Sequence, residues 1–323
     1  MFLKPTEEVV EVLKNRAREL GDGCEKVFIA GSGGADSTAV IATLCQEFGS
    51  ENVVVMYRDI RSDPKHQADV EKLQLVLEFK LLAIDGNPLY DLFLKQCKEQ
   101  FEVAGLDWQD ELSPMADETG FTMAFGSLKS CLTTPMAAFI SKAVDGGRGR
   151  IFGTGNAEED GLLRYYDKRG DGAVDNNILD GLTKMEVRQM LMYFSQLYDS
   201  NIFESIALKT PSADLEACGD GQNDEDQLTS WARAMGYDIE LSYGDCETEG
   251  NIAWALKEDL NRGIITGAGS KMPPAYLKTV YGYTDEQCQL IEFLRHMETS
   301  TRHKIEPIPG LPRTTLRVMG LVD

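Results

Sequence analysis

The sequence predicts an α/β fold, a doubly wound parallel sheet flanked by helices, for residues 1–323 as a single domain. Short apolar runs alternate with helix-like stretches along the first half of the chain. A glycine-rich turn joins the first strand to its helix, and no internal repeat or low-complexity tract interrupts the pattern. A chain of 323 residues is also long enough to bury a full core.

The predicted elements follow from local patterns in chain order. Amphipathic spacing indicates a helix over 6–20, and an apolar run indicates a buried strand over 26–30. The same reasoning predicts, in order, a helix over 37–48, a strand over 52–56, a helix over 67–78, a strand over 79–84, a helix over 89–101 and a strand over 149–153. Such alternation implies right-handed crossovers, with ligands gathered at the carboxyl ends of the strands.

Several stretches lack a clear period. Residues 105–128 and 155–182 are predicted to be long loops, which in compact domains are usually functional or disordered. Residues 244–269 are acidic, polar and hard to assign, so we expect longer loops near 105–125 and 244–269. The tail 306–323 carries three prolines and is expected to wrap over the domain.

Composition narrows the function classes. There are 32 Lys and Arg against 53 Asp and Glu, and the net charge of −21 repels nucleic-acid backbones. No apolar run approaches the roughly 20 residues of a membrane span, and the acidic N-terminus does not resemble a signal peptide. Seven scattered cysteines without a Cys-x-x-Cys pair favour reduced thiols. We therefore expect a cytoplasmic protein with no nucleic-acid or membrane partner.

The most informative stretch is the glycine-rich turn at residues 31–37, Gly-Ser-Gly-Gly-Ala-Asp-Ser. Backbone N–H groups at such a turn and helix start converge on one point, and the helix dipole there favours an anion. The Gly-Lys-Ser/Thr ending of the Walker motif is missing, and Ser37 stands where the Rossmann pattern needs its third glycine. The remaining Ser-Gly-Gly-x-Asp-Ser resembles the PP-loop of N-type ATP pyrophosphatases, although a ligand-free turn is the simpler alternative.

Polar segments later in the chain carry side chains suited to nucleotides and divalent cations. A hydroxyl and carboxylates at 153–160 follow the fourth predicted strand. Residues 165–175 combine cations, carboxylates and glycines in one loop, and Leu-Thr-Lys at 182–184 predicts a capped helix start. A polar turn at 209–216 and a basic cluster at 301–304 complete the set.

Together these segments resemble the ammonia-dependent NAD synthetases, from about residue 5 to about residue 310. The matching motifs are Ser-Gly-Gly-x-Asp-Ser at 32–37, Gly153-Thr154 with Glu159, Lys-x-Gly-Asp-Gly-x-x-Asp at 168–175, Leu-Thr-Lys at 182–184, Pro-Ser-Ala-Asp-Leu-Glu at 211–216 with Asp224-Glu225, and His303-Lys304. The motifs at 168–175 and 211–216 are the specific ones, because other PP-loop enzymes lack them. The resemblance implies an adenine nucleotide alpha hydrolase-like, Rossmann-like fold.

The resemblance also implies a reaction and its residues. A ligase of this kind adenylates the nicotinate carboxylate of deamido-NAD with ATP, releases pyrophosphate, and amidates the product with ammonia to give NAD and AMP. By position, Asp36, Glu159 and Lys184 would be catalytic, with Mg²⁺ held by Asp36 and Glu159. ATP would contact Gly31, Ser32, Gly33, Gly34, Ala35, Asp36, Ser37, Thr154, Lys184 and Ser212. Deamido-NAD would contact Lys168, Asp175, Asp224, His303, Lys304 and the residue at position 131.

Position 131 departs from the family pattern. Cys131 stands where the family has an arginine, and a thiol lacks the charge and the fork of donors of a guanidinium. One extra residue also lies between Glu159 and Lys168. Two alternatives stay open: a PP-loop amide synthetase or sulfur-transfer enzyme that adenylates another acceptor, and a non-catalytic nucleotide sensor. The net charge disfavours a tRNA acceptor, and the Asp36–Glu159 pair disfavours a sensor.

The sequence also leads to expectations about the nitrogen source and the oligomeric state. Since only residues 1–30 precede the PP-loop, we expect no fused glutaminase domain and either free ammonia or ammonia from a separate partner. The family resemblance implies a homodimer.

Overall fold

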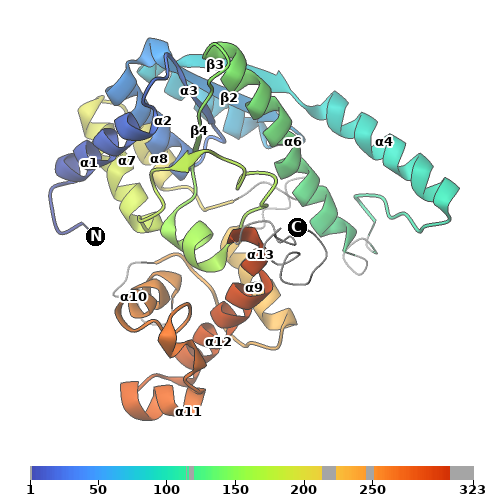
Figure 1. Cartoon of the computed structure of the whole chain (residues 1–323), viewed down its shortest axis with the longest axis vertical. Coiled ribbons are helices and arrows are strands. Elements are labelled where there is room, and N and C mark those ends of the chain that lie inside the picture. The colour runs from blue at the N-terminus through green and yellow to red at the C-terminus, as the bar shows by residue number, and fades with distance from the viewer. Residues whose placement is uncertain (1, 114, 116–119, 213–222, 245–250, 306–323) are drawn as a thin grey trace, which may run out of the picture.

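The computed structural model describes the whole chain except residues 1, 114, 116–119, 213–222, 245–250 and 306–323. The predicted tail at 306–323 therefore lies outside the described residues. A sheet with its covering helices forms one end of the molecule, and a group of helices from the C-terminal third forms the other (Figure 1).

The sheet contains five parallel strands in the order β3-β2-β1-β4-β5. Their bounds are β1 (Val27–Ala30), β2 (Val53–Asp59), β3 (Lys80–Asp85), β4 (Ile151–Gly153) and β5 (Asn176–Asn177). Phe28 of β1 is in register with Val54 on one side and Ile151 on the other. Strand order reverses at β1, so the loops that follow β1 and β4 diverge there and leave a crevice for a ligand. The predicted doubly wound sheet is confirmed.

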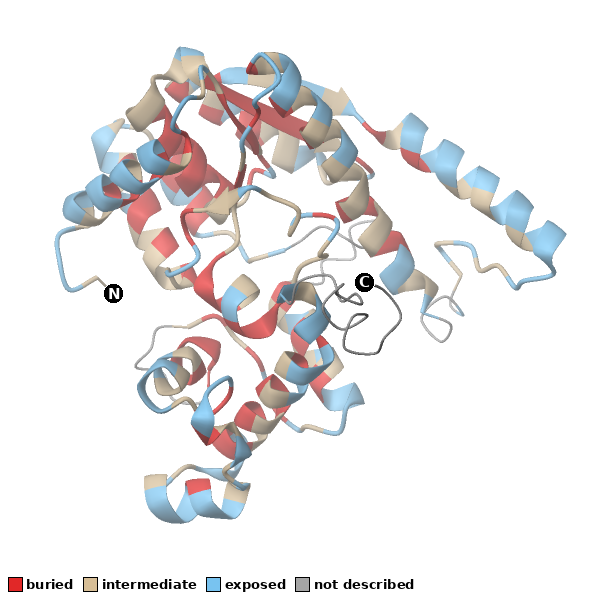
Figure 2. Cartoon of the chain, viewed as in Figure 1, coloured by how far each residue is buried: buried red, intermediate tan, exposed pale blue. Residues whose placement is uncertain are grey.

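Helices cover both faces of the sheet (Figure 1). The larger core packs against α1 (Thr6–Leu20), α2 (Ala35–Phe48), α3 (Pro64–Leu77), α7 (Lys184–Leu197) and α8 (Ile202–Ala207). On the opposite face, α6 (Phe121–Val144) packs against Phe28, Val54 and Met56 through Ala137. The long helix α4 (Asn87–Ala104) projects from the molecule and is largely exposed (Figure 2).

A second hydrophobic core lies among the C-terminal helices. These are α9 (Asp224–Ala234), α10 (Ile252–Arg262), α11 (Pro274–Tyr276), α12 (Asp285–Ser300) and α13 (Arg302–Ile305). Short helical turns are η1 (Ser50–Asn52), η2 (Ala157–Leu163), η3 (Ala268–Lys271) and η4 (Leu277–Tyr281), of which η2 and η4 are π-helical. No helix in the described ranges is long and apolar enough to cross a membrane.

Most element predictions are confirmed. The helix at 6–20 has the predicted bounds, and the other predicted helices and strands lie within three residues of theirs. The loop predictions are partly wrong, because α6 already begins at Phe121, η2 lies inside 155–182, and α10 lies inside 244–269. In α10, Asn251 caps the N-terminus by accepting from Trp254 N at 2.8 Å, and Gly263 ends the helix with φ +60°. An apolar face around Trp254 is buried, whereas the charged residues that hid the period are not.

Candidate active site

A cavity of about 1780 Å³ opens at the carboxyl ends of β1 and β4. It is bordered by the PP-loop, the start of α7, the length of α6 and the C-terminal helices. The predicted site residues that line it are Gly31, Ser32, Gly34, Ala35, Asp36, Ser37, Cys131, Thr154, Glu159, Lys168, Lys184, Ser212, Asp224, His303 and Lys304. Of the predicted set, only Gly33 and Asp175 are not among the lining residues.

The PP-loop is shaped by close packing and by its own hydroxyl groups. Gly33 has φ +80°, and a Cβ there would lie 2.7 Å from the carbonyl oxygen of His66, so no other residue fits. Ser32 Oγ accepts from Gly34 N at 3.2 Å and lies 3.1 Å from Ser37 Oγ. Because α2 begins at Ala35, the first N–H groups of that helix have no intrahelical acceptor. This loop can therefore bind the phosphates of an anionic ligand.

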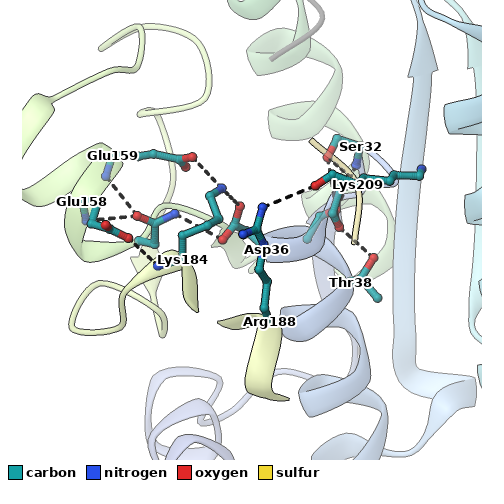
Figure 3. A network of polar contacts seen from close by, with 11 residues as sticks. Ser32, Asp36, Thr38, Glu158, Glu159, Lys184, Arg188 and Lys209 are labelled. Carbon is teal, nitrogen blue, oxygen red and sulfur yellow. Dashed lines mark hydrogen bonds and ion pairs between the residues drawn. The ribbon is translucent and has the colours of Figure 1, made fainter. Parts of the chain in front are cut away.

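Lys184 lies at the centre of the polar network (Figure 3). It is the first residue of α7, whose start is fixed by a capping box between Thr183 and Glu186. Its Nζ lies 2.6 Å from Asp36 Oδ2 and 2.5 Å from Glu159 Oε1, and its side chain is only 6% exposed. Three segments distant in sequence thus bring the predicted catalytic residues together.

Asn156 organises this cluster, although the sequence reasoning gave it no role. Its Nδ2 donates to Asp36 Oδ1 at 3.2 Å, and its Oδ1 accepts from the backbone N–H groups of Glu158 and Glu159 at 3.0 and 2.9 Å. Asn156 is fully buried and is the N-cap of η2. An asparagine before an acidic run is an N-cap signal, and it could have been found in the sequence.

Glu158 and Tyr243 complete the surroundings of Lys184. The fully buried Glu158 accepts from Lys184 N at 2.5 Å, and its Oε1 has no hydrogen-bond partner among the described residues. The Tyr243 ring centroid lies 5.4 Å from Lys184 Nζ. Tyr243 is far away in sequence, and no local pattern marks it.

The titratable groups reflect this burial. Burial raises the pKa of Glu158 to about 7 and that of Glu159 to about 8, against the opposing effect of the Lys184 charge. Burial lowers the pKa of Lys184, but the charges of Asp36 and Glu159 outweigh this effect and raise it. The ionised forms of Glu158 and Glu159 therefore depend on a nearby cation, and Lys184 stays protonated.

The same carboxylates fit a magnesium ion. Asp36 and Glu159 both reach the one point that the Lys184 ammonium occupies, so their oxygens can share a cation. Mg²⁺ is usually held by one or two carboxylates together with substrate phosphates and water. Within the described ranges no three His, Cys, Asp or Glu side chains form a metal cluster. Phosphate oxygens and water would therefore have to supply the remaining ligands.

The glycine loop at 168–172 packs tightly against α6. A Cβ on Gly170 would lie 2.0 Å from Ser130 Oγ, and one on Gly172 would lie 2.4 Å from the Tyr166 ring. Asp171 Oδ1 accepts from Ser130 Oγ at 2.7 Å. Positions 170 and 172 therefore accept only glycine, because neighbouring side chains occupy the space that a Cβ would need.

The predicted basic residues meet at this loop. Lys168 Nζ donates to the carbonyl oxygen of His303 at 2.5 Å. Lys304 Nζ donates to the carbonyl oxygens of Arg164 and Tyr166, at 2.7 and 2.5 Å. Lys168 is more than a hundred residues from His303 and Lys304 in the sequence, and the structure brings them together in the lining of the cavity.

Two predicted substrate contacts have other partners in the structure. Cys131 Sγ lies 3.8 Å from Ser127 Oγ, and burial raises the pKa of the thiol, so Cys131 is not an activated nucleophile. Asp175 Oδ2 accepts from Ile151 N at 2.8 Å and so secures the start of β4. A role for Asp175 in substrate binding stays a prediction that the cavity lining does not support.

A parallel sheet with a PP-loop at its switch point, beside a buried lysine–carboxylate cluster, defines a nucleotide-binding α/β enzyme. The chain matches the model of the NAD synthase family over residues 6–237. It belongs to that family, which is a family of ligases.

Individual relatives of the chain carry the name NH(3)-dependent NAD(+) synthetase. The chain is 33% identical over 212 residues to an NH(3)-dependent NAD(+) synthetase of Methanococcoides burtonii, covering 64% of this chain and 68% of the relative. A protein of the same name from Carboxydothermus hydrogenoformans is 24% identical over 307 residues, covering 95% and 96%. The match to the Halobacterium salinarum relative, at 29% identity, covers 60% of this chain and 63% of that protein.

Solved structures share the fold. An NMN synthetase from Francisella tularensis superposes with a TM-score of 0.64 at 18% identity, covering 95% of this chain and 98% of that one. An NH3-dependent NAD synthetase from Campylobacter jejuni superposes with a TM-score of 0.59 at 18% identity, covering 96% and 100%.

Proposed function

We propose that this chain makes NAD from deamido-NAD, ATP and ammonia. The substrate carboxylate attacks the α-phosphorus of ATP, which gives an acyl-adenylate and releases pyrophosphate. Ammonia then attacks the activated carbonyl, loses a proton, and expels AMP. The observation that carries this proposal is the contact of Lys184 with Asp36 and Glu159 beside the PP-loop.

The residues divide this work by their positions. The loop N–H groups and the hydroxyls of Ser32 and Ser37 would bind the departing pyrophosphate, and Thr154 and Ser212 would contact ATP from across the cavity. Lys184 would neutralise negative charge that develops on the phosphoryl oxygens. Asp36 and Glu159 would hold Mg²⁺, which supplies further charge neutralisation at the phosphates when bound.

Another part of the cavity lining would hold the acceptor. Lys168 and Lys304 supply ammonium groups there, and His303 supplies an imidazole, which suit the phosphates of a dinucleotide. Side chains from both cores line the cavity, Ile206 from the larger and Met297 from the smaller. We therefore propose that the two cores belong to a single domain with one active site between them.

We further propose a homodimer. On α4, Leu92 and Phe93 are 53% and 45% exposed. Among the described residues of this helix, only Tyr90 is buried. The neighbouring α6 exposes Phe139 to 73%. A projecting helix with this much apolar surface is stabilised when a second copy covers it. We propose the cytoplasm as the location, because ATP is the co-substrate.

The test is a reaction of the purified chain with deamido-NAD, ATP, Mg²⁺ and ammonium, in which NAD and pyrophosphate are measured separately. The proposal predicts equal amounts of both products, and no NAD when glutamine replaces ammonium. Pyrophosphate without NAD would point to another acceptor chemistry. Bound ATP without either product would favour a sensor.

A further inference from the structure

Lys209 contacts both the PP-loop and α3, and the proposed reaction gives it no role. It lies two residues after the end of α8, before the segment that carries Ser212, and Figure 3 shows it beside Arg188. Its Nζ lies 3.4 Å from the carbonyl oxygen of Gly33 and forms an ion pair with Asp69 of α3. Arg188 of α7 donates to the Lys209 carbonyl oxygen at 3.4 Å.

The contact with Gly33 acts on a peptide that could otherwise rotate. In a planar trans peptide the carbonyl of Gly33 and the N–H of Gly34 point in opposite directions. Lys209 holds the carbonyl from one side, and Ser32 Oγ accepts from the N–H on the other side at 3.2 Å. Two adjacent glycines restrict this rotation little, so these two hydrogen bonds set the peptide plane.

Asp69 fixes the lysine in this position. Asp69 is 8% exposed, whereas its second cationic partner Lys72, at 3.3 Å, has a side chain that is 62% exposed. A buried carboxylate needs a close cation, and Lys209 is the more buried of the two lysines. The carbonyl of His66 on α3 also lies against Gly33. The PP-loop is therefore connected to α3 twice, directly through His66 and indirectly through Lys209 and Asp69.

We infer that Lys209, held by Asp69, is a positioning residue that orients the Gly33–Gly34 peptide of the PP-loop for the pyrophosphate part of ATP. The inference rests on the proposed function, because it assumes that this loop binds ATP. It predicts a defect confined to ATP and pyrophosphate, because the loop that Lys209 contacts is the part proposed to bind pyrophosphate, whereas other residues are proposed for the acceptor.

The first variant is Lys209→Met, which keeps the length of the aliphatic stem and removes the donor. Binding of MgATP and of pyrophosphate is measured by calorimetry, and steady-state kinetics are measured for all substrates. We expect both dissociation constants and the KM for ATP to rise about tenfold, the size of one lost hydrogen bond from a charged group. The KM values for deamido-NAD and ammonium are expected to stay unchanged.

A second variant separates positioning from stability. Lys209→Met alone leaves Asp69 buried without its main partner, which lowers stability. In the double variant Asp69→Asn with Lys209→Met, the unpaired charge is gone, so the melting temperature should recover. If Lys209 positions the loop, the ATP defect persists in the double variant. Lys72→Met, which removes the other partner of Asp69 but does not touch the loop, serves as the matched control and should bind ATP normally.

Each remaining outcome overturns a different statement. Recovery of ATP binding together with stability in the double variant would show that Lys209 has only a structural role. Unchanged ATP binding in Lys209→Met would exclude any role in the loop. Failure of the wild-type chain to bind MgATP or pyrophosphate would instead contradict the proposed function.

Discussion

The ammonium of Lys184 neutralises two carboxylates at once, and all three side chains are mostly buried. Charged groups interact strongly there, because little solvent screens them. The same isolation makes each member of the cluster hard to replace, since loss of one charge leaves the others buried and unbalanced. Single substitutions at this point are therefore expected to impair the chemistry and also to lower the free energy of unfolding.

Asp36 provides the first prediction at this scale. Asp36→Ala removes one proposed Mg²⁺ ligand and one partner of Lys184, so the rate of pyrophosphate release should fall on the order of 100- to 1000-fold. Circular dichroism should show an intact fold. The exposed Asp22 gives a matched control, as Asp22→Ala should keep full activity. Wild-type rates in Asp36→Ala would remove Asp36 from the proposed metal site.

Position 131 provides the second prediction at the scale of single residues. In Cys131→Arg, a guanidinium would enter next to Ser127, whose hydroxyl already bonds Asp167. We expect the variant to fold, with activity unchanged or with a lower KM for deamido-NAD, because position 131 lines the same cavity as the proposed acceptor residues. Thermal melting and steady-state kinetics test this. A collapse in folding would show that position 131 does not match the family arginine.

Single residues also show how far the sequence could predict the site. Asp36, Glu159 and Lys184 lie in motifs with fixed spacing, and the structure brings all three together. Tyr243 and Lys209 were missed, because their roles arise only when distant segments meet, whereas the N-cap role of Asn156 is local and could have been predicted. No spacing rule along the chain encodes the contact between Lys209 and Gly33.

At the scale of secondary-structure elements, Asp145 connects α6 to the sheet. It ends α6, is fully buried, and its Oδ1 accepts from the N–H groups of Glu25 and Lys26 at 2.6 and 3.0 Å, just before β1. Burial alone would raise the pKa of Asp145, but the hydrogen bonds from Lys26 and Glu25 outweigh it and hold the pKa below its usual range. The ionised form is thus the one that stabilises the fold.

The stability of this connection should depend on pH. Because the pKa of Asp145 is lowered on folding, its contribution is complete above about pH 4 and is lost as the pH falls through the folded value. Asp145→Asn should reduce the free energy of unfolding by about 1–3 kcal/mol at pH 7. Urea titrations at several pH values should show the difference from wild type shrinking in acid. A difference that stays constant down to pH 3 would contradict this account.

Elements with a clear period were predictable, and the misses have physical causes. The helix α6 begins directly after Gly120, in a stretch where glycine and small polar residues obscure the helical period. The segment η2 is a π-helical turn, in which Gly161 N donates to Asn156 O at 3.4 Å. Such a turn depends on tertiary contacts and has no simple sequence signature.

At the scale of the whole molecule, the active-site cavity lies between two hydrophobic cores, and this arrangement was not predicted. Alternating strands and helices predicted the sheet, but no local pattern indicated the separate helical core that supplies the other wall of the cavity. Apart from α12, the described C-terminal helices have at most 11 residues and are separated by turns, so their packing follows from contacts distant in sequence.

The assembly is testable at the same scale. Leu92→Glu places a charge on the exposed apolar face of α4, which should convert the proposed dimer to a monomer. Sedimentation velocity measures the change in mass. Leu75→Glu on α3, where the side chain is 77% exposed, is the control and should leave the dimer intact. A wild-type chain that sediments as a monomer would contradict the proposal directly.

The most direct test of the central claim follows an oxygen atom. Deamido-NAD labelled with ¹⁸O in both carboxylate oxygens is converted with ATP, Mg²⁺ and ammonium, and the products are analysed by mass spectrometry. An acyl-adenylate transfers one labelled oxygen to AMP and leaves the other in the amide of NAD. The account predicts one ¹⁸O per AMP and none in pyrophosphate. NAD formed together with unlabelled AMP would contradict it.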